Sequence, residues 1–254
     1  MIAVSFFSYN GKKIFYETQG DGKPLVFLHG NTSSSKLFKP MLPLYKDFQV
    51  ILIDFLGYGR SDRLKKFPVE LWKEEARQTI ALLEHLAIKE ANLVGTSGGA
   101  WVAINAAFLR PDLIATVTAD SFDGRTFHDG FDEALLAERS STMADPEASE
   151  FYHWCIGDDW KEVVERDTDC LWRMIISRRE LFFDSLQILQ APLLLTATKK
   201  DGTIRPNIER EYQAIVGEVV KGEFKIFENP GHPAIGTSAE EVAKTIHQFI
   251  TQYS

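Results

Sequence analysis

The chain has 254 residues, of which 44% are hydrophobic and 25% charged, and this composition is typical of one large globular domain with room for an insertion. The net charge of −8 argues against nucleic acid as a partner, and no apolar run reaches the length that crosses a membrane. Residues 1–7 lack the basic start of a signal peptide, and the spacing of Cys155 and Cys170 fits neither a metal site nor a redox pair, so we expect two free thiols and a cytoplasmic protein.

Strand-like and helix-like segments alternate along most of the chain. Asn10 and Gly11 predict a hairpin between the first two strands. Helices are expected at residues 36–45, 68–86, 100–109 and 206–216, and a last one follows a capping box formed by Ser238 and Glu241. This alternation predicts an α/β fold with a mostly parallel eight-stranded sheet and helices on both faces. The strands are expected at residues 4–9, 12–18, 25–28, 50–53, 91–94, 113–119, 192–197 and 223–227.

Residues 121–187 break the alternation with several polar helical stretches. This segment holds 16 acidic and 7 basic residues, a net charge of −9, whereas the rest of the chain holds 20 and 21. We therefore predict a core made of residues 1–120 and 188–254, and a helical insertion at 121–187. The acidic surface of the insertion would repel polyanionic substrates if part of it lines the entrance to the site.

The sequence Gly95-Thr96-Ser97-Gly98-Gly99 lies between an apolar strand and a long apolar helix. A serine on such a tight turn has a strained backbone, so the flanking glycines must lack side chains for strand and helix to close up. The hydroxyl then projects above the sheet, and the N-terminus of the following helix presents free N–H groups to an oxyanion. The pattern predicts Ser97 as a nucleophile.

A serine hydroxyl is protonated at neutral pH and needs a base, which in turn needs an orienting carboxylate. His232 follows the last strand, and Asp201 follows the strand before it, giving the chain order Ser, Asp, His. Because the carboxyl ends of parallel strands share one edge, these side chains are expected to meet there. We predict Ser97, His232 and Asp201 as the catalytic residues, with Asp120, at the end of another strand, as the alternative acid.

With these motifs the chain resembles the α/β-hydrolase superfamily over nearly its whole length. The resemblance implies that the backbone N–H groups of Asn31 and Gly98 form the oxyanion hole and that residues 121–187 are a lid over the nucleophile. It also implies structural roles for His29, beneath the oxyanion loop, and for Asp54, which fixes a turn near the site. No set of His, Cys, Asp and Glu residues has metal-ligand spacing, and we expect neither a metal nor a cofactor.

The residues around the serine depart from the commoner form of the superfamily, which has histidine before the serine and methionine after it. Here these positions are Thr96 and Gly98. The stretch His29-Gly30-Asn31 is also similar to haloalkane dehalogenases, in which the asparagine helps to hold halide. Serine in place of their aspartate would leave an ether that water cannot cleave, so Ser97 excludes the dehalogenase and epoxide hydrolase readings.

The leading hypothesis is a serine hydrolase that cleaves a small neutral ester through an acyl-enzyme. C–C bond hydrolases, lactonases, aminopeptidases and perhydrolases use the same triad and remain open, as does a ligand-binding receptor with slow or lost turnover. The partner in each case is a small molecule. Aromatic residues of the lid, with Trp154 and Trp160 as the first candidates, are expected to set the preference for acyl length.

Overall fold

The computed structural model describes residues 3–253, so residues 1–2, on which part of the signal-peptide prediction rests, lie outside it. The described residues form one eight-stranded sheet with the order β1-β2-β4-β3-β5-β6-β7-β8. β2 runs antiparallel to β1 and β4, and the other neighbours pair in parallel, which confirms the predicted sheet. The strands are β1 (Ala3–Tyr9), β2 (Lys12–Gln19), β3 (Lys23–Leu28), β4 (Phe48–Asp54), β5 (Ala91–Thr96), β6 (Ile114–Asp120), β7 (Leu193–Thr198) and β8 (Gly222–Phe227).

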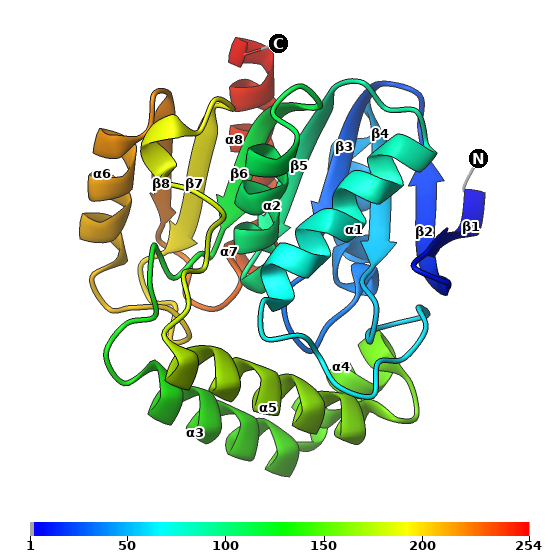
Figure 1. Cartoon of the computed structure of the whole chain (residues 1–254). Helices are drawn as coiled ribbons and strands as arrows, with labels where there is room; N and C mark the ends of the chain where they lie inside the picture. Colours follow the sequence, from blue (N-terminus) through cyan, green and yellow to red (C-terminus); the bar gives the residue numbers. More distant parts are fainter. Residues whose placement is uncertain (1–2, 254) are drawn as a thin grey trace.

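Helices cover both faces of this sheet (Figure 1). On one face, α1, α2 and α6 share a hydrophobic cluster with the strands, and on the other face η1 and α8 form a second cluster. Almost every residue of α2 is buried, because this helix packs against β5, β6 and α1 at once. These elements are η1 (Ser35–Tyr45), α1 (Leu71–His85), α2 (Gly98–Leu109), α6 (Ile208–Glu218), the single turn α7 (Ala234–Thr237) and α8 (Ala239–Tyr253).

The predicted insertion contains three helices, α3 (Phe131–Ala144), α4 (Pro146–Ile156) and α5 (Trp160–Ser177). In Figure 1 they lie together beyond the carboxyl ends of the parallel strands, while the other helices flank the sheet. The insertion therefore faces the edge at which ligands of such sheets bind. Within residues 3–253 no helix is both long enough and apolar enough to cross a membrane.

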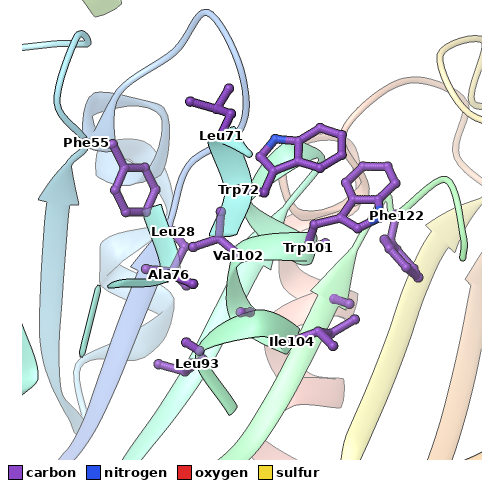
Figure 2. Close-up of a cluster of buried hydrophobic side chains, with 14 of the residues drawn as sticks. Leu28, Phe55, Leu71, Trp72, Ala76, Leu93, Trp101, Val102, Ile104 and Phe122 are labelled. Atoms are coloured by element: carbon purple, nitrogen blue, oxygen red, sulfur yellow. The ribbon is translucent and has the colours of Figure 1, made fainter. Parts of the chain in front are cut away.

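A pair of stacked tryptophans connects the core to this edge. Trp72 of α1 and Trp101 of α2 have ring centroids 4.1 Å apart and are nearly parallel, at 3° (Figure 2). Phe122, just after β6, meets the Trp101 ring edge-on at 4.9 Å. Large aromatic rings in these arrangements add packing energy beyond their buried area. They form a rigid apolar floor beneath the insertion.

Several helix starts differ from the sequence prediction, including those of α2, at Gly98, and α6, at Ile208. α1 begins at Leu71 rather than at Pro68, with Glu70 in the N-cap position. At α8 the predicted capping box is absent: the Ser238 hydroxyl is buried without a hydrogen-bond partner in the described structure. The reason is that α7 runs directly into Ser238, whose N–H donates to Ala234 O and whose carbonyl accepts from Val242 N. Ser238 therefore continues the backbone hydrogen bonding from α7 into α8, and its side chain is buried in the protein.

Candidate active site

The turn between β5 and α2 has the strain that the sequence predicts. Ser97 has φ 53° and ψ −123°, a region that non-glycine residues seldom adopt. A Cβ at Gly95 would lie only 1.9 Å from the Gly99 carbonyl oxygen, so no other residue fits there. The Ser97 N–H donates to Asp120 O on the neighbouring strand at 2.8 Å, which holds the turn in place. The serine is thus presented at the carboxyl edge of the sheet.

His232 and Asp201 form a hydrogen-bonded pair at the ends of the last two strands. The His232 Nδ1 atom lies 2.8 Å from Asp201 Oδ2, and the Asp201 side chain is 1% exposed. The other carboxylate oxygen of Asp201 accepts the Thr203 N–H at 2.9 Å, which fixes its rotamer. A carboxylate on Nδ1 leaves Nε2 of the neutral ring free to act as a base. This is the pairing that the sequence predicts for the orienting acid.

Asp120, the alternative acid, lies beneath the site and has other partners. Its carboxylate accepts the hydroxyls of Thr96 at 2.8 Å and Thr196 at 2.7 Å, and the Ile235 N–H at 3.1 Å. None of its hydrogen bonds in the described structure goes to His232. Burial raises the pKa of this carboxyl to about 6, although the hydrogen bonds act in the opposite direction. Asp120 therefore connects the nucleophile strand to the loop that carries His232.

One cavity of about 530 Å³ contains the predicted nucleophile, base and oxyanion loop. Ser97, His232, Asn31 and Gly98 all line it. Within residues 3–253 the N–H groups of Asn31 and Gly98 donate to no other protein group, so both are available to an incoming oxygen. The described structure has no direct Ser97–His232 hydrogen bond, a contact that often tightens only when substrate binds.

The wall of the cavity is mainly apolar. Core and insertion each supply part of it, and Trp154 and Trp160, the residues first expected to line the pocket, are not among the lining residues. Trp154 is 44% exposed on the outer surface, and Trp160 packs against Tyr152 inside the insertion. Several charged side chains also reach the cavity: Asp123, Glu138 and Arg139. The principal apolar residues are Trp72, Trp101, Phe131, Leu135, Leu171 and Ile204.

His29 supports the loop beneath the oxyanion position. The ring is buried, its Nδ1 lies 2.8 Å from the Gly30 carbonyl, and its Nε2 accepts the Phe55 N–H at 3.1 Å. Nδ1 must then carry the proton, so the ring is neutral, and burial lowers its pKa. These bonds hold Gly30 in place just before Asn31.

Asp54 holds the neighbouring turn, as the sequence analysis expects. Its carboxylate accepts the N–H groups of Ser35 and Arg60, each at 2.9 Å, and forms an ion pair with the Arg60 guanidinium. Burial raises the pKa of Asp54, but Arg60, together with His29 and Ser35, holds this pKa below its ordinary value. The network anchors the start of η1 next to the oxyanion loop.

One acid and one base of the insertion have roles that no motif indicates. Asp167 of α5 is fully buried and accepts a hydrogen bond from the Asn31 side chain at 2.6 Å. Arg139 of α3 forms an ion pair with Asp167 at 3.2 Å. The acidic composition of the insertion hides these residues, since a buried aspartate looks in sequence like any surface one. His128 does not line the main cavity, but it pairs with Asp123, which does.

Within the described part of the chain, no three His, Cys, Asp or Glu side chains come together as a set that could hold a metal ion. The two cysteines are buried and free. The groups that the structure brings to this edge include the Ser97 hydroxyl, the His232–Asp201 pair and the two N–H groups.

Known proteins share both the sequence pattern and the fold. The family model for the alpha/beta hydrolase fold matches residues 23–147. The chain is 34% identical to the uncharacterized hydrolase YugF of Bacillus subtilis (strain 168) over 114 residues, which are 44% of this chain and 41% of that protein, so the match spans less than half of YugF. It is 25% identical to the AB hydrolase superfamily protein YisY of the same strain, over 93% of this chain and 94% of that protein.

The solved structure of a thermophilic esterase from Thermogutta terrifontis has the same fold, with a TM-score of 0.76 and 20% identity over 99% of this chain and 98% of that chain. Together with the family match, these findings show that the chain belongs to the α/β-hydrolase superfamily.

Proposed function

We propose that the protein is a serine hydrolase that cleaves a small, neutral, partly apolar ester through an acyl-enzyme. The observation that carries this proposal is the convergence of four groups at one cavity: the strained Ser97, the His232–Asp201 pair, and the unengaged N–H groups of Asn31 and Gly98. The names of relatives and of solved structures, which include hydrolases and esterases, agree with it.

In the proposed reaction, Ser97 Oγ attacks the ester carbonyl carbon while His232 Nε2 takes the hydroxyl proton. Asp201 accepts the Nδ1–H bond and stabilises the imidazolium that forms. The oxyanion of the tetrahedral intermediate accepts the N–H groups of Asn31 and Gly98. The intermediate collapses, His232 gives its proton to the leaving alcohol, and an acyl-Ser97 ester remains. Water, activated by His232, then attacks the acyl carbon and releases the acid.

The cavity supports a neutral substrate with an apolar part. Stacked Trp72 and Trp101 together with Leu135 provide an apolar wall, and burial of an acyl or alcohol chain there would supply most of the binding energy. Asp123 and Glu138 line the cavity with a single arginine, so the local charge disfavours an anionic substrate. Free thiols at Cys155 and Cys170 support our expectation of a reducing compartment such as the cytoplasm.

Steady-state turnover of p-nitrophenyl acetate, butyrate and octanoate tests the proposal, with lactones, amino-acid amides and C–C bond substrates as the competing panel. The expected result is ester turnover well above background that Ser97→Ala reduces by several orders of magnitude. A preference for another panel substrate would reassign the reaction while keeping the nucleophile. Release of at most one product per protein molecule would instead favour a binding protein.

A further inference from the structure

The side chain of Asn31 is fixed by two hydrogen bonds that determine how its amide is turned. Trp72 Nε1, which can only donate, lies 3.1 Å from Asn31 Oδ1. The amide nitrogen therefore faces the other way and donates to Asp167 Oδ1 at 2.6 Å. Asn31 Oδ1 also lies close to Gly98, since a Cβ at Gly98 would come within 2.2 Å of it. The Asn31 side chain thus lies between Gly98, which carries the second predicted oxyanion donor, and Asp167 of the insertion.

Asp167 is held rigidly at the other end of this connection. Its side chain has no exposed surface, and Oδ1 also accepts the Tyr58 hydroxyl at 2.5 Å. Arg139 supplies the balancing positive charge at 3.2 Å from Oδ2. A buried carboxylate with three partners has little freedom to move, and its hydrogen bond to an amide is stronger than one between neutral groups. Asp167 can therefore impose a position on Asn31.

The other two helices of the insertion touch the same loop. Arg139 of α3 donates to the Thr32 hydroxyl at 3.0 Å. The Ser34 hydroxyl donates to the Cys155 carbonyl of α4 at 2.7 Å. Thr32 has a positive φ of 51°, a conformation that a threonine keeps only when its surroundings enforce it. The loop that carries the Asn31 N–H is therefore shaped by contacts from all three helices of the insertion.

We propose that Asp167 is a positioning residue, which acts through the Asn31 side chain to aim the Asn31 backbone N–H at the oxyanion. This inference rests on the proposed function. It makes the insertion part of the catalytic apparatus as well as a wall of the pocket: the helix that covers the cavity also sets the geometry of one oxyanion donor. A displaced donor stabilises the transition state less and leaves the ground state almost unchanged, so kcat falls and KM hardly moves.

The test compares Asp167→Asn and Asn31→Ala with a matched control. The two substitutions change the acceptor and the donor, respectively, of the hydrogen bond between Asn31 and Asp167. Asp159→Asn is that control, because Asp159 also joins the insertion to the core, through Arg63 at 2.7 Å, without touching the oxyanion loop. For each variant, kcat and KM for the best ester are measured, together with the inhibition constant of a trifluoromethyl ketone. That inhibitor forms a tetrahedral adduct with the serine and places its oxyanion between the two N–H donors.

The expected result for Asp167→Asn and Asn31→Ala is a fall in kcat of about 10- to 100-fold, with a matching rise in the inhibition constant and little change in KM. The double variant should lose no more kcat than the less active of the two single variants, since both substitutions remove the same hydrogen bond. Asp159→Asn should keep kcat. If wild-type turnover depends on Ser97 but folded Asp167→Asn or Asn31→Ala keeps the wild-type kcat, the inference about Asp167 is overturned and the proposed function stands. If the wild type shows no turnover that depends on Ser97, the proposed function is overturned as well.

Discussion

Asp120 has a raised pKa, and this makes the stability of the protein depend on pH in a predictable way. The shift from 3.8 to about 6 corresponds to two pKa units, or about 3 kcal/mol between the two protonation states. An acid whose folded-state pKa lies above its unfolded value stabilises the fold fully below the unfolded pKa, and this contribution is lost as the pH rises through the folded pKa. The free energy of unfolding should therefore fall by ~3 kcal/mol between about pH 4 and pH 7 because of Asp120 alone.

Asp120→Asn removes this titration and keeps the shape of the side chain. An amide there can accept from Thr96 and from the Ile235 N–H, and its NH₂ can donate to the Thr196 hydroxyl, which is free to rotate. The unfolding free energies of wild type and variant, measured in urea at a series of pH values, should diverge by about 3 kcal/mol from pH 4 to pH 7 in favour of the variant.

The hydrogen bond from Thr196 lowers the pKa of Asp120, so it provides a second test of the reasoning. Thr196→Val removes that bond and should raise the pKa of Asp120, so that the loss of unfolding free energy extends to higher pH. Parallel curves for wild type and Asp120→Asn across this range would show that the carboxyl is not shifted by burial, and would refute the argument.

Three further predictions concern the acid, the pocket and the support of the oxyanion loop. Asp201→Asn should lower kcat on the order of 10⁴-fold in ester assays, because the imidazole then adopts the wrong tautomer, whereas a greater loss in folded Asp120→Asn would transfer the role to Asp120. Leu135→Ala should shift the preference between acyl lengths by about 1–3 kcal/mol, measured as ratios of kcat/KM, while its exposed neighbour Leu136→Ala should not. Arg60→Met leaves the Asp54 carboxylate buried without a counter-charge and should lower the free energy of unfolding by about 3–5 kcal/mol, and a loss below 1 kcal/mol would show that the pair is unimportant.

The sheet and the positions of Ser97, Asp201 and His232 could be predicted from local sequence. Apolar runs locate the strands, and parallel strands bring their carboxyl ends to one edge. Which of Asp120 and Asp201 lies against His232 could not be derived in this way, because both end strands on that edge. The hydrogen bond of 2.8 Å to Asp201 distinguishes them in the structure.

The contacts of the insertion had no sequence signal. Asp167 and Asn31 are 136 residues apart, and nothing in a stretch of charged helix marks the one carboxylate that becomes buried. The prediction that Trp154 and Trp160 line the pocket was wrong for a related reason. The composition of a helix that packs against several neighbours does not reveal which of its faces meets the cavity. At Ser238 the local capping pattern was overridden by the preceding turn of α7.

The assignment of Ser97 as the nucleophile is tested by identifying the residue that a fluorophosphonate labels. Labelled protein is digested and the adduct is located by mass spectrometry, with turnover followed in parallel. We expect one adduct, on Ser97, with loss of activity in proportion to labelling and no adduct in Ser97→Ala. An adduct on another serine that abolishes turnover, or full turnover by protein fully labelled at Ser97, would contradict it.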